Sequence, residues 1–351
     1  MENGQRQLPL CGRYLIFPVK NGAAKQKVQI SVDGQVQREF FIELADAQPD
    51  FWVFTDMSPW QGKTATIQVA GLPPTASGLL AIVCADSAPG ADDRYQEASR
   101  PQFHFSSRRG WLNDPNGLVY YQGEYHLFYQ HNPYGVQWEN MHWGHAVSPD
   151  LVHWQELPAA LYPFSQAKGH AYSGSVVVDH ANSAGFGQGT APAMIAAFTD
   201  TACGEALAYS NDCGRSWSYA PDNPVVRHEG RDPKVFWYSA GQHWVMALYD
   251  IREGKHGIAF LTSADLKTWQ RQSWLDGFFE CPDLFPLPVS GEPHTVVWVL
   301  SGADGNYRLG DFDGKTFIPI SAKLPFQYGN AYYAAQTYNE IPAEDGRRIQ
   351  I

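Results

Sequence analysis

Short runs in which apolar and polar side chains alternate dominate the first part of the chain, and a period of two predicts β-strands. The clearest runs cover residues 14–19, 27–32, 35–42, 51–54, 64–69 and 79–83. Asp33-Gly34 separates the second run from the third, and Asp-Gly between two such runs signals a tight β-hairpin. These strands bring no cluster of acids or histidines with them. Residues 1–97 are therefore predicted to form a small β-sandwich-like domain without catalytic groups, followed by a linker.

From about residue 98 onward, one pattern recurs: a turn that leads into a strand and ends on an aromatic residue. Its copies lie at 148–154, 210–217, 263–269 and, in degenerate form, 311–317. They recur every roughly 48 to 63 residues, which suits a β-propeller blade of four strands. A helical solenoid is the alternative at such a period, but almost no segment has apolar residues at a spacing of 3.6. The chain is thus predicted to be all-β, with a β-propeller over residues 98–351.

A polar motif precedes each terminal aromatic by roughly 37 to 43 residues. These motifs contain Asp114, Ser173, Asp232 and Glu280. The first strand of each blade lines the central channel, so these four side chains are predicted to converge around one axis. Taken alone, Asp114 followed by Pro-Asn-Gly is more often a loop that caps its own backbone. The repeat is what favours a chemical role for it.

Composition and charge narrow the possible functions. The formal net charge of −11 argues against nucleic acid or an anionic membrane surface as the main partner. Aromatic residues make up 14% of the chain, which suits strands and platforms for sugar-like ligands. The five cysteines show neither Cys-x-x-Cys spacing nor a zinc pattern, and Cys203 with Cys213 is the one pair that spacing leaves open. No apolar run is long enough to span a bilayer, and no signal peptide is visible.

Three carboxylates around one channel indicate glycoside hydrolysis. Like charges a few ångströms apart raise at least one pKa, so one acid stays ionised while another keeps its proton. A glycosidase needs such a pair, one at the anomeric carbon and one at the leaving oxygen. A hard cation such as Ca²⁺ also gathers carboxylates, but no Asp-x-Asp ligand loop is present among these three. We therefore expect no metal and no other cofactor.

Further residues near these motifs are candidates for substrate contact. Trp111 and Trp138 can pack against sugar rings, although each alone is more often a core residue. Asn113 and Gln130 can hydrogen-bond to hydroxyl groups. Arg231, beside the second acid, can hold a carboxylate or a substrate oxygen. Ser173 completes the set predicted to contact substrate.

Six motifs in chain order resemble glycoside hydrolase family 32, the family of invertases, inulinases and levanases. They lie at 111–117, 128–130, 141–146, 172–175, 231–233 and 280–283. The resemblance implies a five-bladed propeller with a funnel-shaped site that hydrolyses β-D-fructofuranosyl bonds of fructans (levan or inulin) or sucrose with retention. It implies Asp114 as the nucleophile, Glu280 as the general acid and base, and Asp232 as the stabiliser of the transition state. A retaining pair of carboxyl groups is expected about 5–5.5 Å apart.

The resemblance also bears on the ends of the chain. Four complete blades and the opening strand of a fifth, around 331–337, can be counted. Relatives complete that blade and add a C-terminal β-sandwich, so this chain is expected to be truncated. Residues 1–97 resemble the small β domain that precedes the propeller in some gut-bacterial fructan hydrolases. Such enzymes are exported, which implies a secreted, periplasmic or cell-surface location.

Other functions stay open at this point. A five-bladed glycosidase for arabinan or xylan has a similar centre of three acids. A carbohydrate-binding propeller that is inactive because it is truncated is a second alternative. A fructosyltransferase is a third, since a sugar can take the covalent intermediate in place of water. The oligomeric state is not indicated by any pattern in the sequence.

Overall fold

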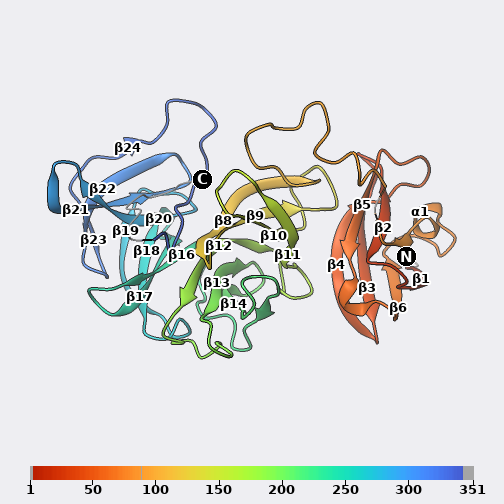
Figure 1. Cartoon of the computed structure of the whole chain (residues 1–351), viewed down its shortest axis with the longest axis horizontal. Helices are drawn as coiled ribbons and strands as arrows, with labels where there is room; N and C mark the ends of the chain where they lie inside the picture. The colour runs from red at the N-terminus through yellow and green to blue at the C-terminus, as the bar shows by residue number, and fades with distance from the viewer. Residues whose placement is uncertain (1–2, 88, 343–351) are drawn as a thin grey trace. The chain divides into compact units, whose positions relative to one another are not determined.

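The computed structural model describes residues 3–87 and 89–342, and its regular elements are almost all β-strands (Figure 1). The predicted all-β class is confirmed. Throughout the described residues, no helix has the length and apolar character needed to cross a membrane. Contacts divide the chain into two compact units. The first unit contains residues 1–113, 131–142 and 161–170, and the second contains 114–130, 143–160 and 171–351.

The first unit contains two antiparallel sheets. The first sheet has the order β1(Gly4–Pro9), β6(Thr64–Val69), β3(Lys25–Val32), β4(Gln35–Glu43), and the second has β5(Phe51–Asp56), β2(Tyr14–Val19), β7(Val83–Ala85). The hairpin predicted between β3 and β4 is present. Asp33 and Gly34 have φ of 53° and 77°, the left-handed backbone that a two-residue hairpin turn requires. Strand β1 is an addition that the alternation did not reveal.

One predicted strand of this unit is wrong. Residues 79–83 do not form a strand; the short helix α1(Ser77–Leu80) precedes β7, which begins at Val83. Leu79 and Ile82 are both fully buried. Residues three apart share one side of a helical turn, whereas in a strand they face opposite sides. The turn therefore lets both side chains enter the core.

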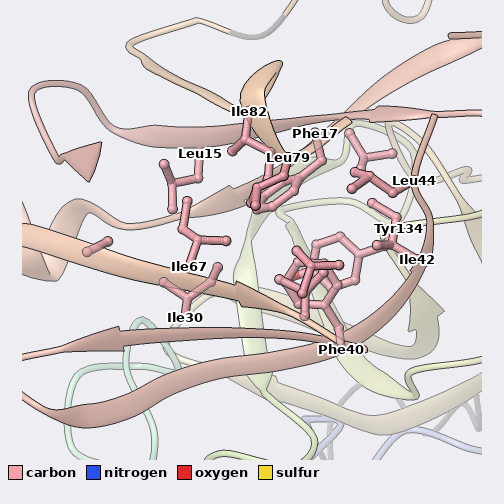
Figure 2. Packing of buried hydrophobic residues seen from close by; sticks show 14 of the residues in the cluster. Leu15, Phe17, Ile30, Phe40, Ile42, Leu44, Ile67, Leu79, Ile82 and Tyr134 are labelled. Carbon is pink, nitrogen blue, oxygen red and sulfur yellow. The ribbon is translucent and has the colours of Figure 1, made fainter. Parts of the chain in front are cut away.

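Apolar side chains from both sheets form the core of this unit (Figure 2). Leu15 and Phe17 come from β2, and Ile30, Phe40 and Ile67 come from the other sheet. The ring of Phe40 packs edge-on against Phe17 at 5.4 Å between centroids. Each large side chain that is fully buried contributes about 1.5–3 kcal/mol. The alternation seen in the sequence is thus the inner face of a small β-sandwich.

Four further antiparallel sheets follow one another along the chain, from yellow-green to blue in Figure 1. Within each sheet, consecutive strands pair in order, as in the up-and-down blades of a propeller. The sheets are β8(Trp111–Tyr121) to β11(Gln155–Leu161) with β9(Glu124–Asn132) and β10(His142–Ser148); β12(Ala171–Asp179) to β15(Ser218–Tyr219) with β13(Ala193–Asp200) and β14(Gly204–Ser210); β16(Arg231–Tyr238) to β19(Gln270–Asp276) with β17(His243–Arg252) and β18(Lys255–Ser263); and β20(Asp283–Val289) to β23(Phe317–Pro319) with β21(Glu292–Ser301) and β22(Asn306–Phe312), to which β24(Leu324–Pro325) adds by pairing with β22.

The repeated motif is the turn between the third and fourth strands of each sheet. Asp150 Oδ1 accepts the backbone N–H groups of Val152 (2.9 Å) and His153 (2.8 Å), and Asp265 does the same for Lys267 and Thr268. The indole of Trp154 donates to the carbonyl of Leu151 at 3.1 Å. The aromatic residue therefore closes the turn. The prediction that it ends a strand is wrong, because β11 begins only after Trp154.

The strand expected around 331–337 is not present in the described part of that region. Asn339 instead forms a parallel bridge with Val119 of β8. The side-chain amide of Asn339 donates to the carbonyls of Val176 (2.8 Å) and Val235 (3.2 Å), so it joins β12 to β16. Nearby, the buried ammonium of Lys234 forms a 3.0 Å ion pair with Asp283 at the start of β20. These contacts bring the first strands of the sheets together.

Candidate active site

Asp114 lies near the start of β8 and is held by a chain of hydrogen bonds. The hydroxyl of Ser173 donates to Asp114 Oδ2 at 2.7 Å. In the amide orientation that pairs both of its ends, Asn116 donates to Ser173 Oγ (3.2 Å) and accepts from Gln130 Nε2 (2.8 Å). Gln130 is buried, and its amide nitrogen also donates to the carbonyl of Ala171 at 3.0 Å. Two of the predicted contact residues, Gln130 and Ser173, thus support this acid.

A glycine fixes the strand immediately after Asp114. Gly117 has φ of 55°, a left-handed conformation that side chains disfavour. A Cβ at this position would lie 2.7 Å from Val176, 2.8 Å from Phe128 and 3.0 Å from Trp143. The backbone of β8 can therefore pack this closely only with glycine at residue 117.

Asp232 is the second residue of β16 and is 5% exposed. The pairing register of β16 with β17 shifts between Arg231 and Lys234, and β12 shifts likewise between Ala171 and Gly174, beside Ser173. Bulges of this kind re-aim side chains and are common next to active sites. The φ of Asp232 is 64°, and its N–H donates to Thr199 Oγ1 at 2.9 Å. The bulge and the left-handed backbone together aim this carboxylate.

Glu280 precedes β20 and lies next to Asp232 through a shared arginine. Arg231 donates to one oxygen of Glu280, and its Nε lies 3.8 Å from Asp232 Oδ2. The phenol of Tyr333 donates to the other oxygen of Glu280. Burial and the hydrogen bond to Glu280 raise the pKa of Tyr333, so the phenol stays neutral and remains a donor. Both oxygens of Glu280 thus have a hydrogen-bond donor.

One sulfur atom joins two of the acids. Cys281 Sγ lies 3.5 Å from Asp114 Oδ2 and 3.5 Å from Asp232 Oδ2. The N–H of Cys281 also donates to Asp232 Oδ2 at 3.2 Å. Burial and the neighbouring acids raise the pKa of the Cys281 thiol, which therefore stays protonated. The structure thus gathers Asp114, Asp232 and Glu280, with Ser173 and Arg231, in one place.

The charges of this cluster are unequal. Burial, and next to it the charge of Asp114, raise the pKa of Asp232 to about 8. The N–H of Cys281 and the charge of Arg231 oppose this rise. Asp232 therefore keeps a proton at neutral pH, as expected for one member of a close group of acids. The family resemblance gives the role of proton donor to Glu280, so the retained proton and that role fall on different members of one coupled group.

The other predicted contact residues belong to the first compact unit. Trp111 Nε1 donates to Asn113 Oδ1 at 2.7 Å. Trp138 is 45% exposed, and its ring centroid lies 5.4 Å from that of His170. The roles of Trp111, Asn113 and Trp138 in substrate contact stay predictions.

Sequence reasoning did not single out three residues of this site. Cys281 was visible beside Glu280 in its motif, and Tyr333 was visible in the segment 331–337, but neither was assigned a role. Thr199 had no signal, because only the pairing of β13 with the neighbouring strands brings it to Asp232.

Two further predictions concern cysteines and metals. The thiols of Cys203 and Cys213 contact Tyr219 Oη (3.7 Å) and Gln122 Oε1 (2.7 Å). Across residues 3–87 and 89–342, no three His, Cys, Asp or Glu side chains are grouped so that they could hold a metal ion.

Comparison with known proteins identifies the family. The profile described as "Glycosyl hydrolases family 32 N-terminal domain" matches residues 104–351. The chain belongs to glycosyl hydrolase family 32. A levanase of Bacillus subtilis is 45% identical over 300 residues, which cover 78% of this chain and 43% of the levanase. An extracellular exo-inulinase of Aspergillus niger is 34% identical over 323 residues, covering 75% of this chain and 59% of that protein.

Solved structures agree with the family 32 assignment. The crystal structure of an exo-inulinase from Aspergillus awamori matches with a TM-score of 0.64 and 32% identity, over 71% of this chain and 58% of that one. The fold is thus the five-bladed β-propeller of family 32, and the four sheets from β8 to β23 are four of its blades. This family 32 chain spans about half the length of the curated relatives that it matches. The resemblance drawn from six motifs is confirmed.

Proposed function

We propose that this site hydrolyses β-D-fructofuranosyl linkages of a fructan or sucrose and retains the configuration at the anomeric carbon. The observation that carries the proposal is the gathering of three acids, with Cys281 Sγ 3.5 Å from both Asp114 and Asp232 and with Arg231 between Asp232 and Glu280. The names of the relatives, levanase and exo-inulinase, support the same class of substrate.

The proposed reaction has two steps. Asp114 attacks the anomeric carbon of the fructosyl unit, while Glu280 gives a proton to the leaving oxygen. The bond to the leaving group breaks as the bond to Asp114 forms, which leaves a fructosyl-enzyme ester. Glu280 then takes a proton from water, the water oxygen attacks the same carbon, and Asp114 leaves as a carboxylate.

The remaining groups stabilise and orient these steps. Asp232 is proposed to bind fructose hydroxyl groups, and its bonds are strongest in the transition state. Ser173 fixes the oxygen of Asp114 that does not attack, because its hydroxyl already donates to Oδ2. Arg231 and Tyr333 orient the carboxyl group of Glu280.

We also propose a location and a division of labour along the chain. Residues 98–351 are proposed to be the catalytic propeller, and residues 1–97 a small accessory β domain. The A. niger relative is named extracellular, which supports export of this protein to the cell surface, periplasm or medium.

Release of fructose tests the proposal. The protein is incubated with levan, inulin and sucrose, and we expect fructose from at least one of them. Asp114→Ala and Glu280→Gln should each lower kcat by about 10²–10⁴-fold or more. Asp222→Ala, which removes an exposed carboxylate outside the cluster, should leave kcat unchanged. If the folded protein releases no fructose from any of the three substrates, or if either site variant keeps wild-type turnover, the proposal fails.

A further inference from the structure

A second buried carboxylate, Glu205, lies behind the candidate active site. It is 0% exposed and stands on β14 directly opposite Thr199 on β13. Neither residue belongs to the motifs from which the acids of the site were predicted. A fully buried carboxylate is costly unless hydrogen bonds satisfy it, so its partners show what it does.

The partners of Glu205 form a continuous path to Asp232. The hydroxyl of Thr199 donates to Glu205 Oε2 at 2.9 Å, and the same oxygen of Thr199 accepts the N–H of Asp232 at 2.9 Å. His228 Nε2 lies 2.7 Å from Glu205 Oε1. The N–H of Gly230 donates to His228 Nδ1 at 2.8 Å. One carboxylate therefore terminates hydrogen bonds from the backbone on either side of Arg231.

These directions allow a single arrangement of protons. Because His228 Nδ1 accepts from Gly230, the ring proton is on Nε2, and His228 donates to Glu205. Glu205 then receives two donors, which suits a carboxylate. Burial raises the pKa of Glu205, and the hydrogen bonds from His228 and Thr199 oppose that rise.

A neighbouring acid does not compete for His228. Asp250 Oδ1 lies 3.8 Å from His228 Nδ1, beyond hydrogen-bond distance. Asp250 Oδ2 accepts instead from Arg252 (3.0 Å) and Arg271 (2.7 Å). The path from Glu205 to Gly230 and Asp232 is thus separate from this ion cluster.

We propose that Glu205, through Thr199 and His228, is a positioning residue that holds residues 230–232 so that the carboxylate of Asp232 faces the reacting sugar. This inference rests on the proposed function. Asp232 has φ of 64°, and a non-glycine residue keeps such a backbone only when its surroundings hold it there. Two anchored N–H groups, one on each side of Arg231, supply that restraint. Glu205 itself does not touch substrate.

Variants of Thr199 test the path without changing an acid of the site. Thr199→Val keeps the shape of the side chain and removes the hydroxyl, and Thr199→Ser keeps the hydroxyl. We expect Thr199→Val to lower kcat about 10- to 100-fold with little change in KM, because displacement of Asp232 weakens the transition state more than the ground state. Thr199→Ser should retain most of kcat. Thr262→Val, which removes a hydroxyl that accepts from Gln272 at 2.7 Å in another blade, should leave kcat unchanged.

A second measurement does not depend on turnover. Amide hydrogen exchange at Asp232 is measured in the ligand-free protein and in both Thr199 variants. Exchange should be faster in Thr199→Val and close to wild type in Thr199→Ser. If Thr199→Val does not fold, Glu205→Gln replaces it, since an amide cannot accept from both His228 and Thr199 in the same way. Wild-type kcat together with unchanged exchange in a folded variant overturns the positioning role. Absence of fructose release from the wild-type protein overturns the proposed function instead, and the exchange result still decides the role of Glu205.

Discussion

At the scale of the residue, the site is built on backbone that its own sequence disfavours. Asp232 and Cys281 each precede a proline, and the residue before proline is driven toward extended backbone with negative φ. Their φ angles are instead 64° and 38°, and that of Glu280 is 48°. Each such residue costs on the order of 1–3 kcal/mol and persists only where contacts impose it. The hydrogen bonds from Thr199 and to Arg231 are contacts of this kind.

The retained proton of the acid cluster predicts a pH dependence. Asp232 has a pKa of about 8, so the ligand-free cluster holds one proton below that pH and loses it above. A glycosidase of this type needs one protonated carboxyl group to release the leaving oxygen. We therefore expect kcat/KM for the substrate that the protein cleaves to fall as the pH rises through about 8. The measurement is kcat/KM from pH 5 to 10 at constant ionic strength, and a profile that is flat from pH 7 to 9 contradicts the assignment.

At the scale of the element, the turn after Asp114 could be predicted, but its packing could not. The sequence Pro-Asn-Gly predicted a sharp reversal with left-handed backbone. The structure gives Gly117 φ of 55° within an extended strand, β8, with three side chains closing around it. Those neighbours come from β9, β10 and β12, so local sequence carried no information about them.

Two glycines of the same sheet separate packing from backbone strain. Gly117→Ala would press a Cβ into Val176, Phe128 and Trp143, whereas Gly123 has φ of 85° and open space around it. Both substitutions strain a left-handed residue, and only the first overpacks the core. We expect Gly117→Ala to lower the free energy of unfolding by about 1–3 kcal/mol more than Gly123→Ala. Urea denaturation of the two variants measures the difference, and equal losses would show that strain alone decides both.

The repeated turn shows a similar limit of sequence reasoning. Its period and its aspartate could be read from the sequence, since Asp150 and Asp265 form the same hydrogen bonds to the backbone N–H groups that follow them. The position of the aromatic residue was predicted one element too early in the order of events: Trp154 closes the turn, and the strand begins after it. Aromatic residues favour strands on average, and here a local hydrogen bond to Leu151 prevails.

At the scale of the whole molecule, the blade count predicted which distant residues meet. Asp114, Ser173, Asp232 and Glu280 were placed at equivalent points of successive blades, and the structure brings them together through Ser173, Arg231 and Cys281. Tyr333, Thr199 and Glu205 could not be predicted, because they reach the site by contacts between strands that no period in the sequence records. Residues 79–83 were misassigned because a short apolar run fits a helical turn and a strand equally well.

The central claim is that Asp114 forms a covalent bond to fructose while Glu280 serves as acid and base. Glu280→Gln incubated with β-D-fructofuranosyl fluoride tests it most directly, because fluoride leaves without a proton from the acid, while the second step still needs the base. Mass spectrometry of the rapidly quenched and digested protein should find one fructosyl unit on the peptide that contains Asp114, and none in Glu280→Gln combined with Asp114→Ala. A fructosyl unit on another residue, or fluoride release by Glu280→Gln that depends on Asp114 with no covalent adduct at any quench time, would contradict the account.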